Sequence, residues 1–117
     1  MADLLVLPAE GPLLGDERSA SDVTGDAISA GAAWVAIPVA RLAPGFLQLS
    51  TRLAGLFLQK LVNYRIGVAI VGDVSAETEA SDALNAFVIE SNRGSTVKFV
   101  KDIDELHARL SRAGERA

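Results

Sequence analysis

Residues 46–73 read FLQLSTRLAGLFLQKLVNYRIGVAIVGD and join a helical pattern directly to a strand pattern. Pro44 suits the first turn of a helix, where its missing N–H is not needed, so we expect one long helix from about residue 44 to Tyr64. Ile66 to Val71 contain no polar side chain, which is typical of a strand covered on both faces of a sheet. A helix that leads into a buried strand is the repeating unit of an α/β fold.

The rest of the chain continues this alternation. Further strands are expected at residues 4–7, 13–14, 33–37 and 96–100, and further helices at 19–30, 75–93 and from 102 onward. The helices have recognisable ends, with a capping box at Ser19–Asp22, Ser75 at the start of the next, and Gly31 and Gly94 as stops. We therefore predict a single α/β domain over residues 1–117, with alternating helices and a largely parallel or mixed sheet of about four to five strands. Residues 111–117 are expected to fray.

Composition excludes several classes of function. The 117 residues include no cysteine, which rules out disulfides, thiolate chemistry and Cys-ligated metals. The net charge of −4 and the lack of a basic patch argue against a nucleic-acid partner. No apolar run reaches the roughly 18 residues of a membrane span, and Met1-Ala2-Asp3 is not the start of a signal peptide. We expect a cytoplasmic protein with no membrane partner.

The predicted long helix is unusually apolar. Gln48, Arg52, Gln59 and Asn63 form one narrow polar stripe, with Gly55 as a gap in its middle, and almost all of the remaining positions are apolar. The remaining arc of about 200° is wider than one sheet face covers. Either a neighbouring helix or a second chain must cover the rest, with Leu49 and Leu56 at the edge of such a surface.

Candidate ligand residues follow the expected strand ends, because ligands of open α/β sheets bind there. We single out Arg41, Asp73 and Arg93 as a possible ligand site. Asp73 has an alternative role, which is to cap the next helix together with Ser75.

Ser50 and Thr51 fall in the first turns of the predicted helix. A phosphate on either hydroxyl would be favoured by the helix dipole and by Arg52, so both are candidate phospho-acceptors. The alternative is that both hydroxyls only bond backbone carbonyls.

No motif of a known catalytic site is present. The chain has no G-x-G-x-x-G, G-K-[ST], H-E-x-x-H or G-x-S-x-G sequence, and His107, its one histidine, is interpreted as structural. We therefore assign no catalytic residue, no metal site and no cofactor. Whether the protein is an enzyme stays open, and the sequence favours a non-catalytic role.

Three blocks of sequence resemble a protein family. They are FLQLSTRLAGLFLQKLVNY from Phe46, AIVGD from Ala69 and FVIESNRG from Phe87. Their combination is similar to the signature of the bacterial family named domain of unknown function 4180, which implies no assigned activity. In that family an acidic residue usually follows the Ala-Gly pair, where this chain has Leu56.

A second resemblance, to STAS domains such as anti-sigma factor antagonists, rests on the order of strands and helices. It implies a phosphorylatable hydroxyl at the start of the helix after the central strand, where Ser50 and Thr51 stand. The usual Asp-Ser/Thr-x-Gly around that position is absent here.

Three functions follow from these observations. The first is a non-catalytic regulatory or protein-interaction module that binds an unknown partner through the helix at about 44–64. The second is a small-ligand-binding protein or enzyme with its site at the strand carboxyl ends. The third is a structural homodimer.

Overall fold

The computed structural model describes the backbone of residues 4–116 and the side chains of residues 4–110. The elements are β1 (Leu4–Val6), α1 (Glu17–Ala30), β2 (Trp34–Pro38), α2 (Leu53–Asn63), β3 (Gly67–Val71), α3 (Ser75–Ala80), α4 (Asp82–Arg93), β4 (Val97–Val100) and α5 (Ile103–Arg116). The backbone of residues 111–116, where fraying is expected, is helical as part of α5, and residue 117 lies outside the described residues. No helix within the described part of the chain is both long and apolar enough to cross a membrane.

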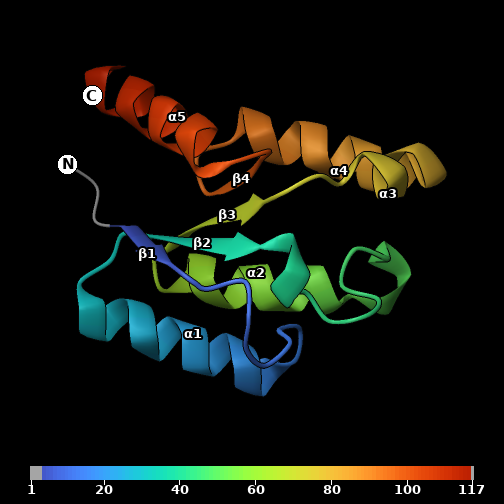
Figure 1. The fold of residues 1–117 in the computed structure, drawn as a ribbon, viewed down its shortest axis with the longest axis horizontal. Helices are drawn as coiled ribbons and strands as arrows, with labels where there is room; N and C mark the ends of the chain where they lie inside the picture. The colour runs from blue at the N-terminus through green and yellow to red at the C-terminus, as the bar shows by residue number, and fades with distance from the viewer. Residues whose placement is uncertain (1–3, 117) are drawn as a thin grey trace.

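The four strands form one sheet in the order β1-β2-β3-β4, and every neighbouring pair is parallel. Right-handed crossovers between successive strands place α1, α2 and α4 on the same face. Figure 1 shows α1 and α2 on one side of the sheet and α5 on the other. The predicted α/β fold is therefore confirmed, with four strands. The short strand expected at residues 13–14 reduces to a single bridge between Leu14 and Leu42.

Strand side chains alternate between two cores. The larger core lies between the sheet and α1, α2 and α4, and its strand residues include Val35, Ile70 and Phe99. The smaller core lies under α5, where Leu106 packs on Ala36 and Ala69 with Val100 beside them. The small side chains of Ala36 and Ala69 let α5 approach the sheet closely. Among the described residues, α5 is the one helix on this face of the sheet.

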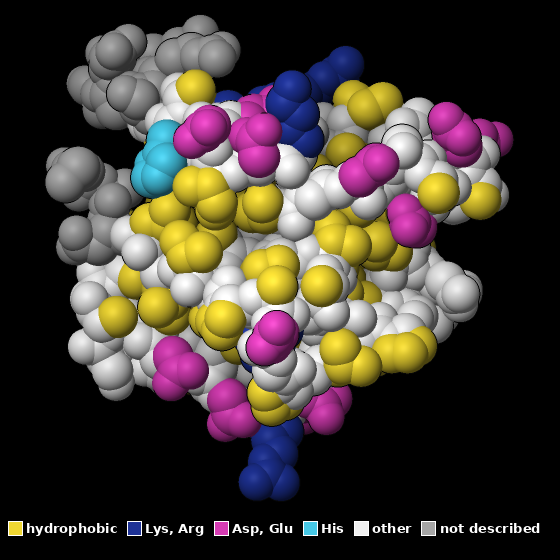
Figure 2. Space-filling model, viewed as in Figure 1, with side chains coloured by type: hydrophobic (Ala, Val, Ile, Leu, Met, Phe, Trp, Pro, Cys, Tyr) yellow, Lys and Arg dark blue, Asp and Glu magenta, His cyan; other side chains and the backbone are white. Residues whose placement is uncertain are grey.

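The β1 edge of the sheet is short and partly apolar. Figure 2, in the same view as Figure 1, shows hydrophobic side chains across the middle of this face, where β1 and β2 lie, with acidic side chains above and below. Val6 in β1 is 49% exposed. A three-residue edge strand offers few unpaired backbone groups to another chain.

Helix α2 begins at Leu53, so the predicted long helix is wrong over its first half. Gly45 and Arg52 have φ values of 85° and 65°, in the left-handed region that a helix does not contain. The Thr51 hydroxyl lies 2.7 Å from the carbonyl oxygens of both Gly45 and Gln48, and it accepts a hydrogen bond from the Leu53 N–H at 3.3 Å. Residues 39–52, here called the β2–α2 loop, therefore fold back on themselves through two 3-10 turns, Val39–Arg41 and Leu49–Thr51.

The single helix expected over residues 75–93 is also wrong, because it is divided in two. Ser81 is extended, with φ −142° and ψ 110°, and separates α3 from α4. Its hydroxyl accepts a hydrogen bond from the Leu84 N–H at 3.1 Å and so caps α4. A serine that caps a new helix competes with continuation of the old one.

Helix α1 starts earlier than expected. Asp16 is its N-cap, and the Asp16 carboxylate accepts from the Ser19 N–H at 2.7 Å while the Ser19 hydroxyl accepts from the Asp16 N–H at 3.1 Å. The predicted capping box at Ser19–Asp22 is thus displaced by one turn, and Ser19 takes the inner position of the box. Gly31 ends the helix in a left-handed conformation, as predicted.

Candidate functional site

A cavity of about 680 Å³ lies at the carboxyl edge of the sheet, between the β2–α2 loop and helices α3 and α4. In Figure 1 this loop and α3 lie at the same end of the molecule, on the right. Ligands of open parallel sheets bind at this edge, and ligand sites commonly enclose about 300–1,000 Å³. We call this space the carboxyl-edge cavity.

Two close approaches of the backbone shape the cavity wall. A Cβ atom on Gly72, at φ 143°, would lie 2.7 Å from the Val39 side chain, so the end of β3 passes directly against the start of the β2–α2 loop. A Cβ atom on Gly45, at φ 85°, would lie 3.3 Å from the methyl group of Thr51. Glycine at these two positions therefore allows the loop to close beside the sheet.

The cavity is mainly apolar with a few polar groups. Its loop wall includes Leu42, Leu47 and Leu49, and its helix wall includes Ala80 and Ala83. The polar lining residues are Gln48, Ser50, Glu77 and Ser81. Apolar walls with a small number of polar groups are the usual composition of a small-molecule site.

Within residues 4–110, Glu77 is the one ionisable residue that lines the cavity. Its Oε2 atom is shielded from solvent and accepts no hydrogen bond from any residue in the described part of the chain. An acceptor removed from water without a donor costs of the order of 1–3 kcal/mol. Glu77 thus lines the cavity, and one oxygen of its carboxylate has an unfilled capacity to accept a hydrogen bond.

The three predicted residues Ser50, Thr51 and Arg52 lie in the β2–α2 loop and not in the helix. Ser50 is exposed and lines the cavity. The Thr51 hydroxyl bonds backbone carbonyls within the loop, which is the alternative considered for it above. Arg52 is exposed and precedes α2 without making a side-chain cap.

Leu56, Gln59 and Asn63 lie on the outer face of α2. Leu56 is 69% exposed, and the Gln59 amide donates to the Asn63 side chain at 2.8 Å. The rest of the apolar arc packs inside the chain through four buried residues: Ala54, Phe57, Leu58 and Leu61. Because α1 and α2 pack side by side, intrachain contacts cover most of the surface that the sequence left open.

Arg41 is buried, and its guanidinium is held by backbone carbonyls. Nε donates to the Pro12 oxygen at 2.8 Å and Nη1 to the Pro8 oxygen at 3.0 Å. A Cβ atom on Gly11 would lie 2.9 Å from the guanidinium carbon, so the loop before α1 wraps tightly around this side chain. In this position Arg41 joins the β1–α1 loop to the end of β2.

Asp73 and Arg93 lie at opposite ends of the parallel strands, Asp73 at the carboxyl end of β3 and Arg93 near the amino end of β4. Asp73 follows β3, and its carboxylate accepts from the Ser75 N–H at 2.9 Å. The N-cap of α3 is Val74, so Ser75 is the first helical residue and does not cap the helix as expected, while Asp73 supports the helix start from one residue before the N-cap. Hydrogen bonds from Ser75, the side chain contributing most, lower the pKa of Asp73. Arg93 ends α4 near the start of β4 and forms an exposed ion pair with Glu90 at 3.2 Å. The structure therefore does not bring Arg41, Asp73 and Arg93 together into one site.

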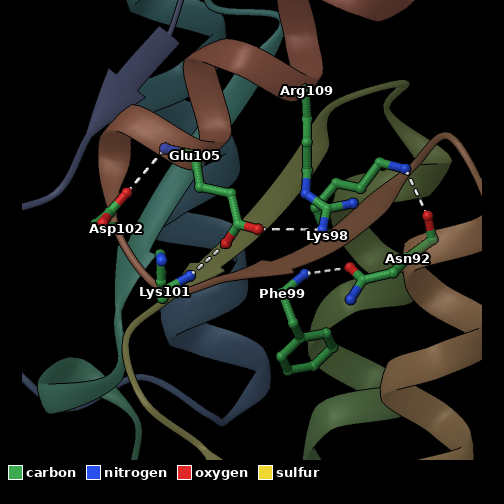
Figure 3. Close-up of polar contacts among 7 residues, drawn as sticks. All are labelled: Asn92, Lys98, Phe99, Lys101, Asp102, Glu105 and Arg109. Carbon is green, nitrogen blue, oxygen red and sulfur yellow. Dashed lines mark hydrogen bonds and ion pairs between the residues drawn. The ribbon is translucent and has the colours of Figure 1, made fainter.

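Residues 87–94, the third block of sequence that resembles the family, anchor the edge strand β4 (Figure 3). The Asn92 side chain accepts from the Phe99 N–H at 2.8 Å. Lys98 Nζ donates to the carbonyl oxygen of Asn92 at 2.9 Å. It also donates to the carbonyl oxygen of Gly94, which the figure does not draw, at 2.5 Å. Burial, followed by the nearby Arg109, lowers the pKa of Lys98. These contacts join the end of α4 to β4 and explain this block as structural.

The start of α5 forms a second polar cluster in Figure 3. The Glu105 carboxylate accepts from the Lys101 N–H at 2.8 Å and pairs with Arg109 at 3.2 Å, while the Glu105 N–H donates to Asp102 at 2.8 Å. The backbone hydrogen bond from Lys101 is the main cause that lowers the pKa of Glu105. Among the described residues, no group of three acidic or histidine side chains is placed to hold a metal ion.

Sequence patterns alone do not single out Glu77 or Ser81, the polar residues of the helix wall. One signal does exist, because Ser81-Asp82 inside an apolar helical pattern is an N-cap followed by an acidic first turn. A helix start at this point implies a break, and the break places residues 77–83 along the cavity. Glu77 has no comparable signal in the sequence.

Comparison with known proteins gives a match to a protein family. The sequence model of the family described as "Domain of unknown function (DUF4180)" matches residues 1–110. No curated protein and no solved structure matches the chain.

Proposed function

We propose that this protein, which belongs to the DUF4180 family of domains of unknown function, is a non-catalytic ligand-binding domain. Its ligand is a small, largely apolar molecule held in the carboxyl-edge cavity. The observation that carries this proposal is the cavity itself, about 680 Å³ in volume, mainly apolar, and located where parallel sheets bind ligands.

The side chains around the cavity support binding rather than catalysis. Acid–base or nucleophilic chemistry needs a nucleophile or proton-transfer group next to a partner that activates it. Glu77 lines the cavity without a histidine, lysine or second carboxylate among the described lining residues. Ser81 uses its hydroxyl to cap α4.

Filling the cavity tests this proposal. Ala83 lines it, and Ala86 is exposed on the same helix one turn further on without lining it. In ligand-observed NMR with a library of small apolar fragments, we expect Ala83→Phe to abolish binding and Ala86→Phe to leave it unchanged. If the wild-type protein binds no fragment, or if both variants bind as the wild type does, the cavity is not a ligand site.

A second candidate is a regulatory protein-interaction module that uses the outer face of α2. Leu56 is 69% exposed and Tyr64 is 57% exposed, and both lie on or next to this helix. Leu56→Glu should then abolish capture of a partner without unfolding the domain, while Ile28→Glu, at a comparably exposed position on α1, should not. If Leu56→Glu keeps the association state of the wild type and captures the same partner, this candidate is excluded. Light scattering of the purified protein would distinguish a structural homodimer from a monomeric module.

Regulation by phosphorylation belongs to this second candidate, and Ser50 is a better phospho-acceptor than Thr51. Ser50 is exposed in the β2–α2 loop, whereas the Thr51 hydroxyl is hydrogen-bonded to two backbone carbonyls of that loop. Intact-mass analysis of protein purified from the native host should show one added phosphate, which Ser50→Ala removes and Thr51→Val does not. An unmodified mass would remove this proposal.

A further inference from the structure

We propose that the ligand of the carboxyl-edge cavity carries a protonated amino group on a compact apolar body, and that this group pairs with the carboxylate of Glu77. This inference rests on the proposed ligand-binding function of the cavity and names the chemical class of its ligand. The occupant is a free small molecule, an aliphatic or aromatic amine.

Charge is the first argument. Among the residues whose side chains the structure describes, Glu77 is the one ionisable group on the cavity wall, and no lysine or arginine lines it. The loop wall is mainly apolar, with Leu42, Leu47 and Leu49, and its polar lining residues, Gln48 and Ser50, carry no charge. Apolar surroundings strengthen the attraction between unlike charges relative to water. The cavity therefore complements a cation and disfavours an anionic ligand.

Unfilled hydrogen bonding at Glu77 is the second argument. Oε2 is shielded from solvent and has no donor among the described residues. The terminal torsion of a glutamate side chain is broad, so the carboxylate can turn and present either oxygen to a donor. An ammonium group supplies short, charge-assisted hydrogen bonds to such an oxygen. A bound amine would thus satisfy a group that the protein leaves without a partner.

The size and composition of the cavity set the rest of the ligand. Its volume of about 680 Å³ matches a small molecule. The helix wall has small side chains at Ala80 and Ala83, which leave space for an alkyl chain or one aromatic ring beside Glu77. Burial of that apolar body would supply most of the affinity, and the ammonium group would select among ligands of similar shape.

The test compares 2-phenylethylamine with its neutral analogue 2-phenylethanol by NMR titration. The variants are Glu77→Gln, which keeps the shape and removes the charge, and Glu79→Gln, which changes an exposed carboxylate on the same helix outside the cavity. We expect the amine to bind the wild type and Glu79→Gln equally, and Glu77→Gln about tenfold or more weakly. The alcohol should bind all three proteins equally.

Each other result has a definite meaning. If the amine binds Glu77→Gln as tightly as the wild type, the inference is overturned while the cavity remains a ligand site, because the alcohol still reports on it. If neither compound binds the wild type, the proposed function fails and the inference fails with it. Tighter binding of a lysine-containing peptide than of the amine would overturn the assignment to a small molecule.

A second measurement does not depend on the folding of a variant. In the wild-type protein, the CH₂ group next to the amine should show nuclear Overhauser contacts to the Glu77 side chain. Contacts only to residues outside the cavity would overturn the inference.

Discussion

Arg41 illustrates at the residue scale how a buried charge can serve structure. Within the described residues its guanidinium is paired with backbone carbonyls of the β1–α1 loop and with no carboxylate. The loop carbonyls of Pro8 and Pro12 have no helix or strand partner in that region, so Arg41 supplies the donors they need. This residue therefore acts as an internal support of the edge where the cavity lies.

We predict that Arg41→Met lowers the free energy of unfolding by about 2–4 kcal/mol, because the hydrogen bonds from the charged guanidinium to the Pro8, Glu10 and Pro12 carbonyls are lost and these carbonyls are left unpaired. Urea unfolding followed by circular dichroism measures this change. Arg18→Met, at an exposed position of α1, should change it by less than about 0.5 kcal/mol. Equal effects of the two variants would contradict the structural role of Arg41.

Arg65 occupies a position that normally favours glycine. The Ile66 N–H donates to the Leu61 oxygen at 3.0 Å and the Arg65 N–H to the Val62 oxygen at 2.9 Å, which is a Schellman motif at the end of α2. Arg65 has φ 61° in this motif, whereas the equivalent motif of α1 has Gly31 at φ 67°. A side chain in the left-handed conformation costs energy that glycine avoids.

Arg65→Gly should therefore raise the free energy of unfolding by roughly 0.5–1 kcal/mol, and Gly31→Ala should lower it by about 1 kcal/mol. Thermal unfolding of both variants under identical conditions tests the pair. A loss of stability in Arg65→Gly would mean that the arginine side chain makes a stabilising contact.

At the scale of elements, β4 depends on a side chain of the preceding helix. As the outer strand of the sheet, β4 has backbone groups that no further strand pairs. Asn92 satisfies one of them, the Phe99 N–H, and the Lys98 side chain returns to the end of α4. The edge is thus covered by α4 without a fifth strand.

We predict that Asn92→Ala destabilises the domain by about 1–2 kcal/mol, because the Phe99 N–H loses its acceptor. Hydrogen exchange at the Phe99 amide should accelerate more than exchange in β2. Asn85→Ala, an exposed position earlier on α4, is the matched control and should leave both quantities unchanged. Slow exchange at Phe99 in Asn92→Ala would argue against the anchor.

At the scale of the whole molecule, three carboxylates at helix starts make stability depend on pH. Hydrogen bonds from Ser19, Ser75 and Lys101 lower the pKa values of Asp16, Asp73 and Glu105 in the folded protein, below the ordinary values of 3.8 for aspartate and 4.5 for glutamate. A lowered folded pKa stabilises the protein above the ordinary value, and this contribution is lost as the pH falls through the ordinary value towards the folded one.

The variant Asp16→Asn/Asp73→Asn/Glu105→Gln should consequently show a flatter decline of the unfolding free energy below about pH 4.5. Asparagine keeps the capping hydrogen bonds, so the difference from the wild type should be larger at neutral pH than at pH 3. Denaturant unfolding across this range provides the measurement. Parallel pH curves for the two proteins would show that other groups control acid stability.

Local sequence determined the fold class, because the relevant signals repeat over a few residues. The apolar run of residues 66–71 predicts a buried strand, and the structure has β3 at Gly67–Val71. Gly31 ends α1 because glycine adopts the left-handed conformation of a helix end at little cost. The pattern of strands and helices then implies parallel pairing, since each connection is long enough to cross over the sheet.

Only the tertiary structure decided where the long helix breaks and what the break creates. In one continuous helix Phe46 and Phe57 would lie about 16 Å apart along the axis, yet their ring centroids are 5.6 Å apart in the core. Burying both aromatic rings requires the chain to fold back at Gly45 to Arg52, although the helical periodicity of these residues is intact. That reversal, together with the break at Ser81, forms the carboxyl-edge cavity and brings Glu77 to its wall. Periodicity reports one element at a time, and the cavity depends on contacts between several elements distant in the sequence.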